Sequence, residues 1–168
     1  MMKNVLVLLS LLMLASCNGG YDHGQGASGS GVTQFASNGE RIYFSGSSDS
    51  GDAISADGGS GHMNMHMRMH GGGCVTCHGV EREGRRLWPQ FWIETPALTP
   101  EALFASDAHD ENGHGDHGSY DDESLRRAIT LGIDPSGVKL EDAMPRWNIS
   151  AADLDDLIAY LKQSHDHD

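Results

Sequence analysis

Two cysteines and a histidine stand together near the middle of the chain, in the order Cys74-Val75-Thr76-Cys77-His78. Two thiols at this spacing, followed at once by an imidazole, form the C-x-x-C-H pattern of covalent haem attachment. In that pattern the thiols add to the vinyl groups of the haem, and the next side chain can reach the iron. Cys74 and Cys77 are therefore predicted to hold a c-type haem, with His78 as its proximal iron ligand.

The same cysteine pair could instead be a redox dithiol or half of a zinc site. A structural zinc site needs further cysteine or histidine ligands at short spacing, and the only other cysteine, Cys17, lies far upstream. A thioredoxin-like dithiol is expected in a βαβ context, whereas the flank of this motif is rich in glycine. The sequence favours haem over both alternatives.

Met144, which is followed by Pro145, precedes the last helical pattern and is the candidate for the second, distal iron ligand. A thioether opposite a histidine stabilises ferrous iron and raises the reduction potential relative to two nitrogen ligands. The alternative is that Met144 fills the core. The Met-Pro pair in a loop at this place favours ligation.

A stretch rich in Met and His, residues 62–70, lies just before the haem motif. In an extended chain, a period of two places its methionines on one face and its histidines on the other. Thioether and imidazole groups bind copper, so the stretch could be a copper strip, or its methionines could pack against the haem edge. Closeness to Cys74 disfavours it as the source of the distal ligand. The strip methionines are Met63, Met65, Met67 and Met69.

Helix-start and helix-stop signals predict the elements that position these residues. Residues 40–44 are expected to form a short helix, and residues 45–61 an irregular loop. Thr99 is predicted to cap a second helix, and residues 120–131 to form a third that ends at Gly132. The last helix is predicted to start at Ser150 and to continue to about Gln163, with one apolar face. That face consists of Leu154, Leu157, Ile158 and Leu161.

Two further clusters lie between the haem motif and the second predicted helix. Arg82, Arg85 and Arg86 form the main basic cluster; they could pair with haem propionates, but most of them are expected to be solvated. The densest apolar and aromatic group follows it and is expected to pack around the macrocycle. That group consists of Leu87, Trp88, Phe91, Trp92 and Ile93.

The amino terminus has the pattern of an export signal. Residues 1–16 carry one lysine and an apolar run too short to span a membrane as a helix. Leu14-Ala15-Ser16-Cys17 resembles the lipobox of bacterial lipoproteins, which implies lipidation at Cys17. Residues 17–37 are predicted to be a flexible linker, residues 38–164 the domain, and residues 165–168 a frayed tail. Within the domain, residues 45–73 and the His-rich residues 106–119 are expected to be insertions.

The chain of 168 residues is strongly acidic, with a formal net charge of −13. Such a surface is not expected to bind nucleic acid, or an anionic membrane other than through a lipid anchor. With one cysteine for lipid and two for haem, none remains for a disulfide.

The haem motif, Met144-Pro145 and the last helix together resemble the class I c-type cytochromes over roughly residues 38–163. The resemblance implies a small all-α fold in which the first and last helices cross beside a single haem. It also implies that a proline carbonyl accepts a hydrogen bond from the proximal histidine; by motif match this is Pro96, with Pro89 as the alternative. Export implies a lipid-anchored protein of the bacterial cell envelope that faces the periplasm or the outer surface.

An iron with both axial positions filled has no site for a substrate, so the resemblance implies an electron carrier and not an enzyme. Its partners would be redox proteins with a basic docking patch. The alternatives are a copper-binding lipoprotein that uses the Met/His strip, a sensor in which a small ligand displaces Met144, and a haem subunit of a larger redox complex.

Overall fold

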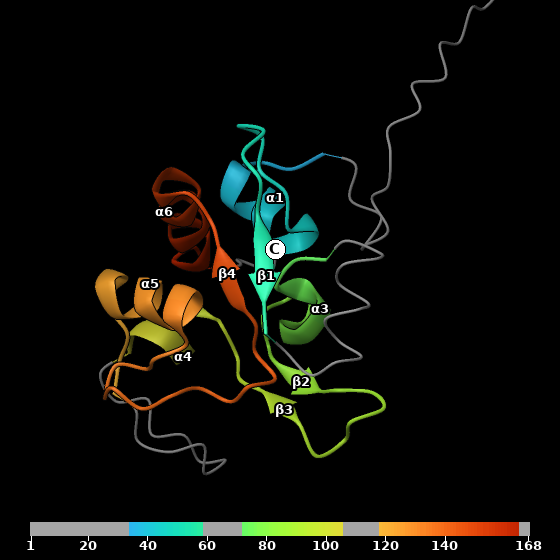
Figure 1. The fold of residues 1–168 in the computed structure, drawn as a ribbon, viewed down its shortest axis with the longest axis vertical. Helices are drawn as coiled ribbons and strands as arrows, with labels where there is room; N and C mark the ends of the chain where they lie inside the picture. The colour runs from blue at the N-terminus through green and yellow to red at the C-terminus, as the bar shows by residue number, and fades with distance from the viewer. Residues whose placement is uncertain (1–33, 59–71, 106–117, 165–168) are drawn as a thin grey trace, which may run out of the picture.

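The computed structural model describes residues 34–58, 72–105 and 118–164 of the chain. These residues form a mostly helical fold with a few short strands (Figure 1). The helices are α1 (Asn38–Ser45), α3 (Val75–His78), α4 (Pro100–Phe104), α5 (Asp122–Leu131) and α6 (Ala151–Leu161). The strands are β1 (Ser55–Asp57), β2 (Arg85–Arg86), β3 (Glu94–Thr95) and β4 (Arg146–Asn148).

The short strands are an addition to the all-α fold that the family resemblance implied. β1 pairs with β4 in antiparallel register, with Ala56 opposite Trp147, and β2 pairs with β3, with Arg85 opposite Thr95. β1 lies inside residues 45–61, which were expected to be an irregular loop throughout. Its partner is about ninety residues away in the sequence, so no local pattern could indicate the pairing.

The first and last helices pack directly against each other (Figure 1). The contact depends on Gly39, because a Cβ atom there would lie 2.0 Å from the main-chain oxygen of Asp156. The rings of Tyr43 and Tyr160 meet one turn further along, with centroids 5.4 Å apart. This arrangement agrees with the helix pairing that the sequence resemblance implied.

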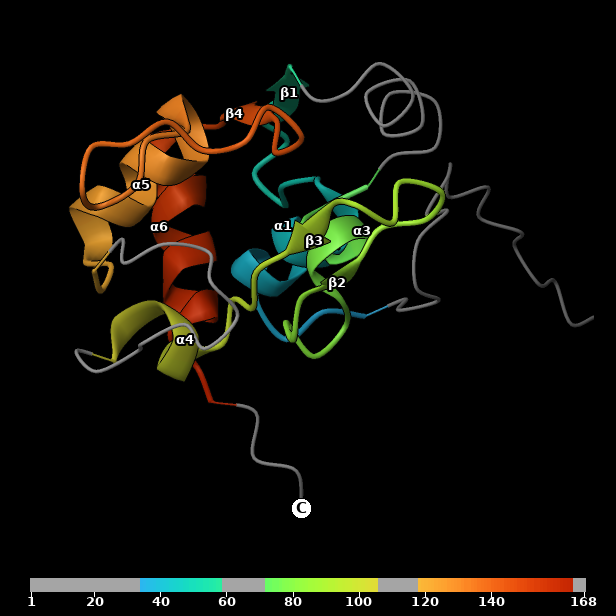
Figure 2. The ribbon, with the colours of Figure 1, turned by 90° about the horizontal axis from the view of Figure 1, so that it is seen from below.

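One apolar core joins α1, α3, α4, α5 and α6. In Figures 1 and 2, α4, α5 and α6 lie on one side of the molecule, and α3, β2 and β3 lie on the other. The predicted apolar face of the last helix is buried in this core, since each of its four aliphatic side chains is at most 5% exposed. The other buried members are Ile42, Tyr43, Phe44, Val75, Leu103, Leu125, Ile129 and Tyr160.

The helix ends follow the predicted capping signals. The Thr99 side chain accepts a hydrogen bond from the Ala102 N–H, and the Ser150 side chain accepts one from the Asp153 N–H. Gly132 ends α5 in the left-handed conformation, with φ of 69°. These caps satisfy backbone groups that a helix leaves unpaired at its ends.

The aromatic side chains in the loop between β2 and β3 do not pack around the macrocycle as expected. Trp88 and Trp92 are 80% and 79% exposed, and Phe91 is 53% exposed, so these three rings do not pack in the core. Leu87 is buried as expected. The sequence pattern shows the apolar cluster, whereas the direction of each side chain depends on the turn of the hairpin.

The basic cluster agrees with the expectation for two of its three arginines, whereas the third is buried. Arg82 is only 1% exposed and donates hydrogen bonds to carbonyl oxygens at the end of α6. Arg85 and Arg86 are exposed, and Arg86 pairs with Glu94.

Several predictions fall outside the described residues. They concern the signal peptide, Cys17, most of the linker, the four methionines of the strip, the His-rich loop and the tail. Among residues 34–58, 72–105 and 118–164, no helix has the length and apolar character needed to cross a membrane.

Candidate haem site

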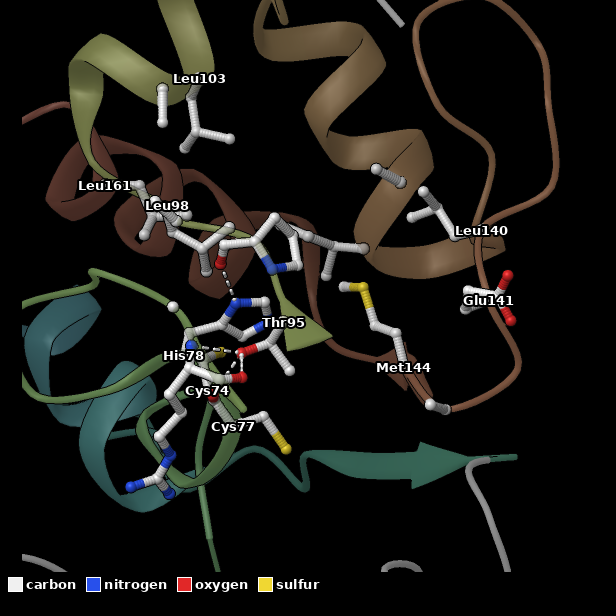
Figure 3. Close-up of a pocket in the computed structure, with 18 of the residues that line it drawn as sticks. Cys74, Cys77, His78, Thr95, Leu98, Leu103, Leu140, Glu141, Met144 and Leu161 are labelled. Carbon is white, nitrogen blue, oxygen red and sulfur yellow. Dashed lines mark hydrogen bonds between the residues drawn. The ribbon is translucent and has the colours of Figure 1, made fainter. Parts of the chain in front are cut away.

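A cavity of about 680 Å³ opens between the haem motif on one side and α4, α5 and the Met144 loop on the other (Figure 3). Cys74, Cys77, His78 and Met144 all line it, although His78 and Met144 are far apart in the sequence. The structure therefore brings the four candidate haem residues to one place. Most of the remaining wall is apolar, and it includes Leu98, Leu103, Leu125, Ile129, Leu140, Leu157 and Leu161.

The short helix α3 presents the haem motif. The His78 N–H donates to the Cys74 carbonyl over 2.9 Å, which closes one helical turn and brings the cysteines and the imidazole to one side. Gly79 ends the turn, and its carbonyl oxygen accepts a hydrogen bond of 2.7 Å from the buried Tyr43 hydroxyl. α1 therefore holds the end of the haem motif through Tyr43.

The ring of His78 is oriented by a main-chain carbonyl. Its Nδ1 lies 2.9 Å from the Pro96 oxygen, and a dashed line marks this contact at the His78 ring in Figure 3. Pro89, the other proline that the sequence left open, is exposed in the β2–β3 loop. Burial lowers the pKa of His78, and the Pro96 carbonyl opposes this shift. A neutral imidazole that donates from Nδ1 leaves Nε2 as the ligand atom.

Thr95, at the end of β3, holds the haem motif through hydrogen bonds. Its hydroxyl donates to the Cys77 carbonyl over 2.6 Å and accepts from the Arg85 N–H over 3.0 Å. The Arg85 guanidinium also donates to the Thr76 carbonyl. The β2–β3 hairpin thus satisfies two carbonyl groups of α3 that no further helical turn could reach.

Met144 reaches the cavity from the loop before β4. Its sulfur is turned toward the side of the cavity on which His78 lies (Figure 3). The guanidinium of Arg146 holds this loop by donating to the carbonyls of Met144 and Leu140. Gly132 leaves room for that guanidinium, since a Cβ there would lie 1.8 Å from Arg146 Nε.

The surroundings of Cys74 and Cys77 raise the pKa values of both thiol groups. Burial raises the pKa of Cys74 to about 12, and burial also raises the pKa of Cys77. A redox dithiol works through a thiolate with a lowered pKa, so this environment does not suit thioredoxin-like chemistry. In the part of the chain that the structure describes, no group of three or more Cys, His, Asp or Glu side chains is placed to hold a metal ion.

The residues present fit a covalently attached haem. The cavity lies in the size range of about 300–1,000 Å³ that cofactor sites occupy, and its wall is mainly apolar, as a macrocycle requires. Two thiols and a neutral imidazole stand on one wall, and a soft thioether stands on the other. This donor set is that of a haem iron with nitrogen and sulfur ligands.

A mostly helical domain with a C-x-x-C-H motif on the wall of such a cavity is typical of proteins that bind c-type haem. The family model for cytochrome c matches residues 69–165, which is more than half of the chain. The chain belongs to the cytochrome c family, and its cofactor is a covalently bound c-type haem. No curated protein and no solved structure matches the chain.

Sequence reasoning did not assign a role to several residues that support the site. Tyr43 binds the carbonyl of Gly79 just after the haem motif, Thr95 binds a carbonyl of the motif, and Arg146 binds a carbonyl of the Met144 loop. Their partners lie far away in the sequence or across a turn, so no motif marks them. Arg146, two residues after Met144, carried the only local signal, as a cation next to the candidate ligand.

Proposed function

We propose that this protein is a single-haem electron carrier whose iron is held by His78 and Met144. The observation that carries the proposal is the placement of these two side chains on facing walls of one apolar cavity. When bound, the haem supplies a one-electron couple between ferric and ferrous iron. Haem-based electron transfer is the general function of the family to which the chain belongs.

Residues of the chain itself support electron transfer by the haem. The apolar side chains of α5 and α6 that line the cavity would keep water away from a bound haem and so limit solvent reorganisation on electron transfer. The Pro96 carbonyl fixes the orientation of the His78 ring, and Arg146 fixes the loop that carries Met144. With both ligands in place the iron has no free position, which supports a carrier over an enzyme.

The cellular setting is part of the proposal. Cys17 would carry lipid and tether the domain to the bacterial cell envelope, on the periplasmic or outer side. The redox partner would present a basic patch to the acidic surface of this chain. The signal pattern of residues 1–17 and the net charge of −13 support these points.

Oxidised and reduced absorption spectra of the mature protein, combined with a redox titration, test this function. We expect covalent haem that withstands acid extraction, a one-electron Nernst curve, and a reduced spectrum that carbon monoxide does not change. A Cys74→Ser/Cys77→Ser variant is the matched control and should lose covalent haem. Colourless wild-type protein, made with a working haem-attachment system, would contradict the proposal. Ready binding of carbon monoxide by the reduced protein would instead support a sensor.

A further inference from the structure

Arg82 is among the most deeply buried large side chains that the structure describes, and it carries a charge. It is 1% exposed and lies in the loop between α3 and β2, four residues after His78. Its backbone has φ of 61°, a left-handed conformation that a residue other than glycine rarely adopts. Such a conformation at a buried arginine indicates that the side chain has a specific place to occupy.

The end of α6 provides that place. Arg82 Nη1 donates to the carbonyl oxygens of Tyr160 and Leu161, each over 3.1 Å, and Nη2 donates to the carbonyl of Gln163. The guanidinium carbon lies 5.1 Å from the centroid of the Tyr160 ring. The last carbonyls of a helix carry partial negative charge, so they hold a cation firmly.

Within the described part of the chain, no carboxylate forms an ion pair with Arg82. None of the ion pairs found among residues 34–58, 72–105 and 118–164 involves Arg82, and its buried Nε has no hydrogen-bond partner. Arginine stays protonated in proteins, and helix dipoles reduce the local potential without removing the full charge. Arg82 is therefore a permanent buried cation.

This cation lies behind the cavity wall that the haem would face. The Leu98 N–H donates to the Arg82 carbonyl over 2.7 Å, and the guanidinium binds the carbonyl of Leu161. Both Leu98 and Leu161 line the cavity. The loop of Arg82 is also joined to the proximal ligand, because the Gly84 N–H donates to the His78 carbonyl over 2.9 Å.

We propose that Arg82 is a fixed positive charge that raises the reduction potential of the haem. Reduction brings one electron to the iron, and a cation close by lowers the energy of the state that holds this electron. Because the guanidinium is buried, dissolved salt screens it little. This inference rests on the proposed electron-transfer function and names a residue that tunes it without touching the haem.

A purely structural role for Arg82 makes a different prediction. If the guanidinium only capped α6, its removal would lower stability and leave the potential of the folded protein unchanged. The two roles are separated by a potential measurement on variants that keep or remove the charge.

The experiment compares midpoint potentials of the wild-type holoprotein with those of Arg82→Lys, Arg82→Gln and Arg82→Gly, at low and at high salt. Lysine keeps the charge without the planar fork, and glutamine removes the charge. Glycine also removes it and accepts the left-handed backbone without strain, so it decides the question if the glutamine variant fails to fold. Arg127→Gln is the matched control, because the half-buried Arg127 also donates to main-chain carbonyls and also has a buried Nε without a partner.

We expect the glutamine and glycine variants to have lower midpoint potentials than the wild type, by similar amounts at both salt concentrations. Arg82→Lys should stay close to the wild type, and Arg127→Gln should lose stability with a smaller shift in potential. A wild-type potential in a folded, charge-free Arg82 variant would overturn the inference, and so would equal shifts in the lysine and glutamine variants or a shift that high salt abolishes. Wild-type protein without covalent haem would instead overturn the proposed function, so the two failures are distinguishable.

Discussion

The surroundings of His78 favour the protonation state and the ring orientation that an iron ligand needs. Burial lowers its pKa, so the ring is neutral near pH 7, and the Pro96 carbonyl fixes the ring at Nδ1. A ligand that is already neutral and oriented loses neither a proton nor rotational freedom when it binds iron. The same residue can therefore be a strong ligand in a site that stays closed to water.

Asp153 is a buried charged residue that connects two helices. It is 2% exposed and accepts hydrogen bonds from Asn38 of α1, Ser48 of the following loop and Ser150, the cap of α6. Burial by itself would raise the pKa of Asp153, and these hydrogen bonds together hold the pKa below its ordinary value. The carboxylate thus joins the beginnings of the two helices that pack against each other.

A lowered pKa in the folded state makes the stability depend on pH in a definite direction. The contribution of Asp153 is fully present above its unfolded pKa, about 4, and is lost as the pH falls through the lower, folded pKa. We expect Asp153→Asn to lower the free energy of unfolding by about 1–3 kcal/mol at neutral pH. The difference from the wild type should shrink as the pH falls below about 4.

Denaturant unfolding of both proteins across this pH range measures the effect. Asp155→Asn is the control, since Asp155 lies on the same helix with its side chain 59% exposed. A difference between Asp153→Asn and the wild type that stays constant with pH would show that ionised Asp153 does not stabilise the fold.

At the scale of the elements, the tight contact between α1 and α6 depends on a missing side chain. A Cβ atom on Gly39 would lie 2.0 Å from the Asp156 oxygen and 2.8 Å from Tyr160 Cβ, so the helices would have to separate. We expect Gly39→Ala to destabilise the protein by about 1–3 kcal/mol, although alanine favours helix formation. Thermal unfolding measures this loss.

Ala159→Leu is the control for added volume, because Ala159 lies on the exposed side of α6. It should leave the melting temperature nearly unchanged. If Gly39→Ala unfolds at or above the wild-type temperature, the two helices do not pack as closely as described.

The elements also show what could be predicted from the sequence and what could not. The caps at Thr99, Ser150 and Gly132 were predictable, because a cap acts on backbone groups within a few residues. The pairing of β1 with β4 was not, because it depends on a partner far along the chain. The exposure of Trp88 and the burial of Arg82 reverse their ordinary preferences, and only the surrounding fold decides them.

The residues of the haem site also fall into those that the sequence could predict and those that it could not. Cys74, Cys77, His78 and Met144 were named from residue type and spacing, and the structure places all four on one cavity. The residues that hold them, such as Thr95 and Arg146, act through hydrogen bonds to the main chain. Such bonds leave no pattern in a sequence, so they become visible only in three dimensions.

For the molecule as a whole, the formal net charge of −13 governs how it meets other charged species. Long-range attraction raises the rate of encounter with cations and lowers that with anions, and salt weakens both effects. We expect electron transfer to a small cationic cobalt complex to slow as the ionic strength rises. Transfer to the anion ferricyanide should become faster under the same change.

Stopped-flow oxidation of the reduced protein by each reagent measures these rates, and the opposite sign of the two salt effects is the internal control. Equal salt dependence for both reagents would show that the acidic surface does not steer encounters at the haem. The proposal of a partner with a basic patch would then lose its support.

The central claim is that sulfur from Met144 binds the iron opposite His78, and the oxidised absorption spectrum of Met144→Ala tests it most directly. We predict that the variant loses the sulfur-to-iron band of the wild type and that its reduced form binds carbon monoxide. A variant with alanine at Met63, Met65, Met67 and Met69 should keep the wild-type spectrum. A Met144→Ala spectrum identical to that of the wild type would contradict the account.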